Sequence, residues 1–188
     1  MGLAGFHRVL AQSRVDGTAL TAAAAASMLH ARDVITLPNG YFREGKQLRL
    51  TASGRISCAV TTPGTARFDV RIGSILAWDS LAMNLNIVAK TNVHWRLEVL
   101  LTCRAIGSGV NSSLIGQGIF TSEAVIGSPL PTVGGVGALT VPVNTAPVVG
   151  ALFNNQLQNT LDVFFTQTVA TGSMTCHQYL LEELDAGD

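Results

Sequence analysis

Hydrophobic and polar residues alternate in short runs from Asp33 onward, and Gly, Pro, Asn and Ser separate these runs. Alternation with a period of two is typical of strands that bury one face. The clearest run spans residues 93–104, with Trp95 on the inward face and Arg96 on the outward face. Further strands are expected at residues 34–37, 47–53, 56–60, 67–72, 114–124, 161–165 and 174–181, with a weaker one at 85–89.

Helical periodicity is almost absent after the N-terminal part, so about eight to ten short strands predict an all-β fold, an antiparallel β-sandwich or jelly roll. Residues 62–65 match a type II turn, and Gly54 is expected to bend the chain. Gly116 and Gly118 share one strand face, where a backbone or a large side chain can approach closely. Residues 127–137 are expected to form a surface loop rich in Gly and Pro.

Residues 1–32 differ from the rest because alanine dominates their composition. Ala22–Ala26 favours a helix by propensity, but Leu20 and Met28 give only a thin apolar stripe, too little for an isolated helix. We therefore interpret residues 1–32 as an extended N-terminal arm, with at most one helical turn, that is ordered by the surface on which it lies. A floppy terminus is the alternative. Residues 33–188 form the predicted β-sandwich domain.

Composition narrows the class of partner. The chain has 188 residues, of which 47% are hydrophobic and 13% are charged, and its 12 basic and 12 acidic residues give no net charge. The apolar content excludes a disordered chain. Zero net charge argues against nucleic acid or an anionic membrane as a partner, since both need a concentrated basic face. A weakly charged surface favours association, so we expect a homo-oligomer, most simply a trimer.

Candidate chemistry is sparse. The three cysteines are odd in number and lack C-x-x-C spacing, which argues against a disulfide framework or structural zinc and favours buried thiols: Cys58, Cys103 and Cys176. His94 and His177 could meet across a sheet, although a solvated face explains them as well. Paired carboxylates for glycoside chemistry are conceivable, but any sandwich with this many acids offers them. We predict no catalytic residue, no metal ligand and no cofactor, and hence a protein that is not an enzyme.

Charge alternates along one predicted strand. Arg67, Asp69 and Arg71 are expected to point outward, and Phe68 and Val70 inward. A row of mixed sign suits pairing between neighbouring strands. The same row could fix the register of a subunit interface, and a solvated strand face is the other alternative.

Several stretches resemble phage and prophage virion proteins of the jelly-roll type. They cover most of the chain between residues 33 and 183, and they are residues 35–57 (ITLPNGYFREGKQLRLTASGRIS), 61–73 (TTPGTARFDVRIG), 95–107 (WRLEVLLTCRAIG), 116–123 (GQGIFTSE) and 173–183 (SMTCHQYLLEE). The resemblance implies a structural β-sandwich of a virion, made in the host cytoplasm, and it carries over no catalytic residues.

Two virion roles fit this resemblance. A capsid decoration (cement) protein would bind the major capsid protein on the head surface, with its arm lying across neighbouring subunits. A tail fibre or baseplate component would contact the host, but its tip should be richer in aromatic residues than this chain. A carbohydrate-binding jelly roll is a third reading, with Trp78 and Trp95 as the available sugar platforms. The candidate contact residues are Arg14, Leu20, Met28, Arg67, Asp69 and Arg71.

Overall fold

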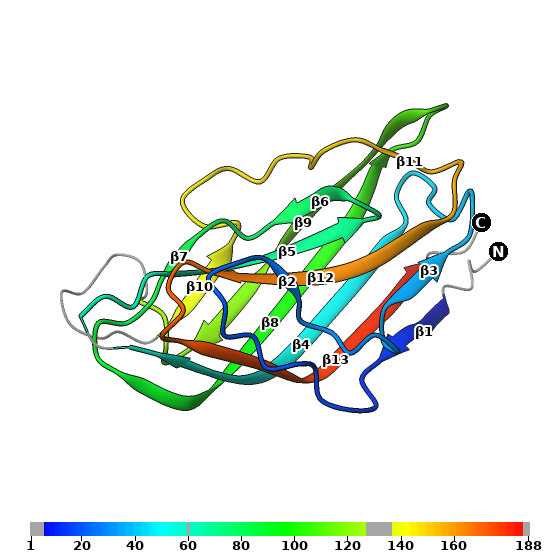
Figure 1. The fold of residues 1–188 in the computed structure, drawn as a ribbon. Helices are drawn as coiled ribbons and strands as arrows, with labels where there is room; N and C mark the ends of the chain where they lie inside the picture. The colour runs from blue at the N-terminus through cyan, green and yellow to red at the C-terminus, as the bar shows by residue number, and fades with distance from the viewer. Residues whose placement is uncertain (1–5, 60, 127–136, 186–188) are drawn as a thin grey trace.

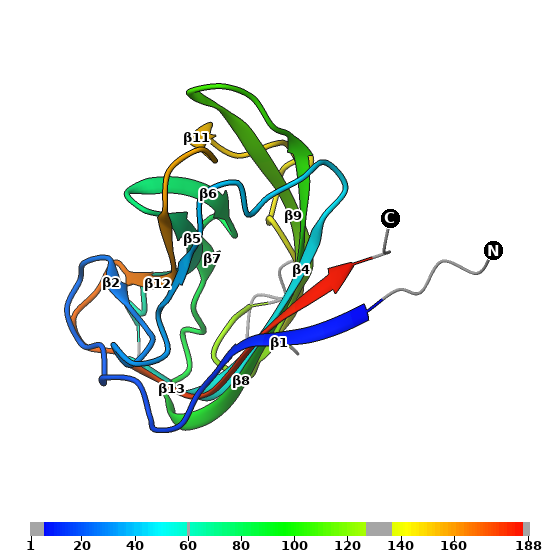
Figure 2. The same ribbon diagram turned by 90° about the vertical axis from the view of Figure 1, so that its right-hand side faces the viewer.

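Two antiparallel β-sheets pack face to face in the computed structural model, which describes residues 6–59, 61–126 and 137–185 (Figures 1 and 2). The large sheet contains β1 (Phe6–Gln12), β4 (Gln47–Cys58), β8 (Lys90–Ala105), β9 (Val110–Ser122), β10 (Ala138–Val141), β11 (Phe153–Asn154) and β13 (Ser173–Asp185). The small sheet contains β2 (Ala26–Ser27), β3 (Ile35–Leu37), β5 (Thr65–Ile72), β6 (Ile75–Asp79), β7 (Met83–Asn84) and β12 (Asn159–Gln167).

The strand order is β1-β13-β4-β8-β9-β10 in the large sheet, where β11 also pairs with β9. In the small sheet it is β2-β12-β5-β6, with β3 beside β12 and β7 beside β5. Every pair of named strands is antiparallel. The prediction of an all-β antiparallel sandwich is therefore confirmed, while its finer form, a jelly roll, stays a prediction.

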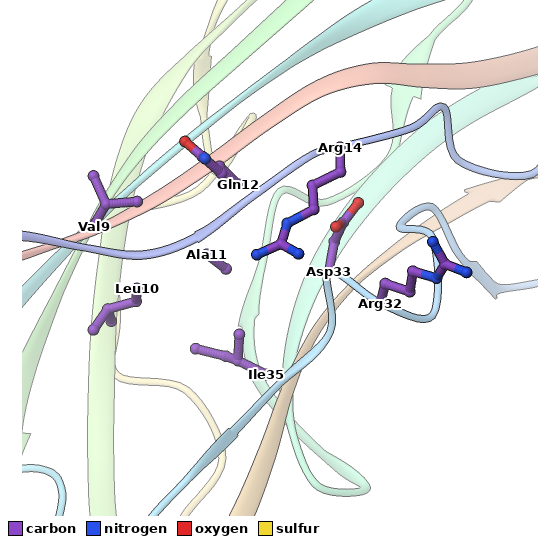
Figure 3. Close-up of a pocket in the computed structure, with 8 residues that line it drawn as sticks. All are labelled: Val9, Leu10, Ala11, Gln12, Arg14, Arg32, Asp33 and Ile35. Atoms are coloured by element: carbon purple, nitrogen blue, oxygen red, sulfur yellow. The ribbon is translucent and has the colours of Figure 1, made fainter.

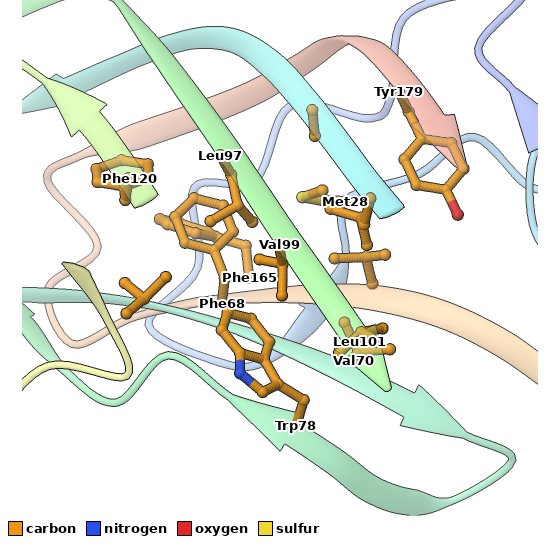
Figure 4. Packing of buried hydrophobic residues seen from close by; sticks show 14 of the residues in the cluster. Met28, Phe68, Val70, Trp78, Leu97, Val99, Leu101, Phe120, Phe165 and Tyr179 are labelled. Carbon is orange, nitrogen blue, oxygen red and sulfur yellow. The ribbon is translucent and has the colours of Figure 1, made fainter. Parts of the chain in front are cut away.

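The inner faces of both sheets supply the core, as the alternation predicts. On β8, Trp95, Leu97 and Val99 are fully buried, and Arg96 and Glu98 between them are exposed. Around Phe68 of β5, ring centroids lie 5.3 Å from Trp95, 5.1 Å from Phe120 and 5.2 Å from Phe165. Phe120 belongs to the large sheet, and Phe68 and Phe165 belong to the small sheet (Figure 4), so aromatic contacts join the two layers in addition to the aliphatic burial.

Glycine allows close approach at Gly116 and Gly118, as predicted, and also at Gly54. A Cβ at Gly116 would lie 2.2 Å from Cδ1 of Trp78, whose indole N–H donates to the Gly116 carbonyl at 3.0 Å. A Cβ at Gly54 would lie 2.0 Å from the carbonyl oxygen of Thr175 on β13. The expected bend at Gly54 is wrong, because β4 runs straight through it and the irregularity is a bulge in β13, between Cys176 and Gln178.

The N-terminal segment lies against the sandwich itself. β1 pairs with β13 in the large sheet, and β2 pairs with β12 in the small sheet. Between them, Leu20 exchanges backbone hydrogen bonds with Met174 at 2.8 and 2.9 Å. The expected helical turn at Ala22–Ala26 is wrong, since these residues form bends and the start of β2. The expected boundary after residue 32 does not coincide with a break in the packing.

The structure also describes the predicted turn at residues 62–65 and the predicted weak strand at residues 85–89. Gly64 has a φ of 73°, as the type II turn requires. No named strand forms at residues 85–89, where Leu85 makes an isolated bridge to Val125. Val60 and all but the last residue of the expected loop at 127–137 lie outside the described residues.

Candidate interaction surfaces

The charged row on β5 is paired within its own sheet. Arg67 donates to both carboxylate oxygens of Asp79, on β6, at 2.7 and 2.6 Å. Arg71 donates from Nε to Asp69 at 2.7 Å. The sequence predicts that Asp69 points outward, but it is only 1% exposed, and it pairs with Arg71 of the same strand. The Arg67–Asp79 pair therefore joins β5 to β6, whereas the Arg71–Asp69 pair lies within β5.

A second set of contacts joins β2, β12 and β5 on the same face. The guanidinium of Arg71 lies 3.8 Å from the ring centroid of Phe164, and Ser27 donates to Asp162 at 2.8 Å. Burial raises the pKa of the Asp162 carboxyl, and the hydrogen bond from Ser27 opposes that rise. Only two residues of β2 pair with β12, so the backbone pairing alone is weak. The hydrogen bond from Ser27 to Asp162 adds a side-chain contact that holds β2 in place.

The contact residues expected in the N-terminal segment have different positions. Met28 is fully buried in the core, so its side chain is not accessible at the surface. Leu20 is partly buried and packs against the core. Arg14 is exposed and lines a pocket between β1 and the turn before β3. Of these three, Arg14 alone presents its side chain to a partner.

A set of exposed aliphatic side chains that could not be predicted from the sequence lies near the β8–β9 connection. We call this surface the apolar tip. It lies on the β8–β9 connection, at the upper right of Figure 1, and on residues 148–157 on both sides of β11. Its side chains are between 43% and 68% exposed, and they are Ile106, Val110, Val148, Val149, Leu152 and Leu157. A cluster of exposed aliphatic residues is typical of a surface that binds another protein.

Backbone pairing holds the two parts of the apolar tip together. Val149 forms a bridge to Ile115, and Asn154 pairs with Val110. The Gln156 side chain accepts a hydrogen bond from the backbone N–H of Gly109 at 3.1 Å. Residues 148–157 therefore run beside the first half of β9, which brings the two parts of the apolar tip onto neighbouring segments of the chain.

Contacts with the buried residue Phe42 hold residues 153–155 in place. Phe153 is buried, with its ring centroid 5.2 Å from that of Phe42. The Asn155 amide accepts from the Phe42 backbone N–H at 3.0 Å and donates to the Phe42 carbonyl at 2.8 Å. The apolar tip is therefore preorganised, and a partner would not have to order it on binding.

A pocket of about 270 Å³ lies between β1 and the turn that leads into β3 (Figure 3). Apolar side chains form part of its wall, and Arg14, Arg32 and Asp33 are its charged residues. Asp33 is 3% exposed. The pocket combines charge with apolar surface and lies at the edge of the large sheet.

The remaining candidate residues are not brought together as a site. His177 pairs with Asp16, at 2.9 Å, and His94 lies opposite Arg55 on the neighbouring strand. In the described ranges, no group of three or more His, Cys, Asp or Glu side chains could hold a metal ion. Both tryptophans are buried, so neither presents a face to a sugar. The described part of the chain contains no helix long and apolar enough to cross a membrane.

The three cysteines are free and buried, as predicted. Burial raises the pKa of the Cys58 thiol, raises that of Cys103 to about 11, and raises that of Cys176 to about 12. A thiol reacts as its thiolate, so all three are poor nucleophiles at neutral pH. Comparison of the chain with protein-family models, curated proteins and solved structures gave no match.

Proposed function

We propose that this chain is a structural protein of a phage particle that decorates the head by binding the major capsid protein. The observation that carries the proposal is the apolar tip, which offers six exposed aliphatic side chains on a preorganised support. Because each side chain is already about half buried, burying the rest of it against a partner would stabilise the complex by roughly 1 kcal/mol.

The distribution of charge favours the same surface. Many charged side chains of the sandwich pair with one another, including Arg67 with Asp79, Arg71 with Asp69, and Arg49 with Glu182. Such groups have little charge left for steering a partner, so apolar burial is the main source of affinity. The resemblance of residues 35–57 and 95–107 to virion proteins supplies the identity of that partner.

Copy number tests the role in the particle. Quantitative mass spectrometry of purified virions should give this chain and the major capsid protein in a ratio near one to one. A few copies per particle would overturn head decoration in favour of a tail component. Absence from the particle would overturn both virion roles.

Substitutions at the apolar tip test the surface. A variant with Val148→Ser and Leu157→Ser should be lost from particles on washing, by at least about tenfold relative to the wild type. The matched control carries Ile87→Ser and Val88→Ser, which replace two exposed aliphatic side chains outside the tip. Equal retention of both variants would refute the role of the tip.

We also propose that the chain binds as a homo-oligomer, most simply a trimer, because few charges oppose association. Light scattering on the purified chain should report about three times the 19.7 kDa mass of one chain. A monomer at micromolar concentration would refute this.

A further inference from the structure

We propose that the pocket between β1 and the turn before β3 binds a basic side chain, arginine or lysine, from another polypeptide. Its anchor is Asp33. This residue is 3% exposed, and in the described part of the chain its carboxylate makes no hydrogen bond or ion pair. The Asp33 oxygens are not among the fully buried side-chain atoms without a hydrogen-bond partner, so they are open to the pocket. A donor with positive charge that reaches this carboxylate would form a charge-assisted hydrogen bond, which is stronger than one between neutral groups.

The pocket walls suit the rest of such a side chain. Val9, Ala11 and Ile35 line it, and these apolar groups match the methylene stem of arginine or lysine. Its volume of about 270 Å³ is smaller than the roughly 300–1,000 Å³ typical of small-molecule sites. One inserted side chain therefore fits the space better than a cofactor or a drug-sized ligand.

The position of the pocket gives a polypeptide access. β1 is the last strand of the large sheet in the described part of the chain, so no described strand lies along its outer edge. A bulge between Val9 and Ala11 interrupts the pairing of β1 with β13 beside the pocket. An extended segment approaching this edge can insert one side chain between β1 and Ile35.

A second buried polar group lies close to Asp33. The Tyr179 hydroxyl is buried and has no hydrogen-bond partner among the described residues. Burial raises the pKa of this phenol, and the negative charges of Asp162 and Asp33 add to the rise. Asp33 is therefore close enough to Tyr179 to influence the titration of its hydroxyl.

Arg14 is the internal competitor. Figure 3 shows Arg14 and Asp33 projecting into the pocket while Arg32 extends away from them. Neither guanidinium forms an ion pair with Asp33 in the structure described. Arg14 is exposed, so its side chain can move into solvent when another cation enters. Removing Arg14 should therefore preserve binding or strengthen it.

The test uses the full chain and two peptides, acetyl-Thr-Val-Arg-Val-Thr-amide and the same peptide with citrulline, which is neutral, in place of arginine. Titration followed by NMR should show the arginine peptide binding at least about tenfold more tightly. Asp33→Asn should abolish that difference, whereas Arg14→Ala should keep it. Equal binding of the two peptides, or no binding of either, would overturn the proposal.

Stability provides an independent readout, since Asp33→Asn removes the negative charge from the pocket while keeping the size of the side chain. Its urea midpoint should be equal to that of the wild type or higher. Matching losses of stability in Asp33→Asn and Arg14→Ala would mean that these two residues pair with each other, and the proposal would fail. The outcome is separate from head decoration, because Val148 and Leu157 of the apolar tip are untouched.

Discussion

Replacing Glu183 by glutamine should destabilise the protein by about 3 kcal/mol, near the lower end of what breaking a buried ion pair costs. The Glu183 side chain is 2% exposed, and Nζ of Lys46 lies 2.7 Å from its Oε1. Lys46 is itself 10% exposed and stands 4.2 Å from the ring centroid of Tyr41. The substitution leaves this ammonium buried beside a neutral amide, which still accepts one hydrogen bond and so moderates the loss.

Urea unfolding measures the effect as a shift in midpoint at constant m-value. The matched control is Glu98→Gln, which breaks the pair with Arg96, where the two side chains are 50% and 57% exposed. That pair should contribute less than about 1 kcal/mol. If the two variants were destabilised equally, burial would not decide the strength of these ion pairs, and the reasoning would be refuted.

Glu183 should also make the free energy of unfolding depend on pH. Burial alone would raise its pKa, but hydrogen bonds from Lys46 and Arg8 lower it below the ordinary value. A carboxyl with a lowered folded-state pKa contributes stability above its unfolded pKa and loses it as the pH falls through the folded pKa. The wild type should therefore lose part of its stability below about pH 4.5, and Glu183→Gln should lose less over that interval.

Three other substitutions or reagents test the packing. Met28→Ala should lower the free energy of unfolding by about 2–5 kcal/mol in urea, because the N-terminal segment buries this side chain in the core. A decrease below about 1 kcal/mol would mean that the segment is not part of the fold. Gly116→Ala should lower the free energy of unfolding by about 1–3 kcal/mol and change the tryptophan fluorescence, since the new Cβ would collide with Trp78. An unchanged fluorescence spectrum would contradict that contact. A thiol reagent should modify no cysteine in the native protein at neutral pH and three in urea; fast native modification would contradict their burial.

Long alternating strands could be predicted because each carries its own evidence for burial. On β8 the inward side chains are all apolar over five alternate positions, and Trp95 fixes the phase. On β6 both Ala77 and Trp78 are buried, because a register shift opposite Val70 breaks the alternation. Local periodicity therefore misses β6, whose position depends on its neighbour in the sheet.

The candidate surfaces were harder to predict for a related reason. Val148 and Val149 belong to a short apolar run, which reads locally as a buried strand. Val148 and Val149 are nevertheless exposed, whereas Phe153 of the same segment is buried beside Phe42. Asp33 likewise gives no local sign of burial, because β1 and the turn before β3 enclose it only after the two sheets have packed.

The pairing of β1 with β13 has a mechanical consequence. Phe6 lies opposite Asp185, so the first and last described residues start from adjacent positions on one sheet edge. Tension between these two ends would load the outermost backbone hydrogen bonds one after another and peel β1 away from β13. Such a geometry resists force far less than the simultaneous shearing of a whole strand. The sandwich would therefore yield first at its N-terminal strand, while the longer pairing of β13 with β4 stays intact.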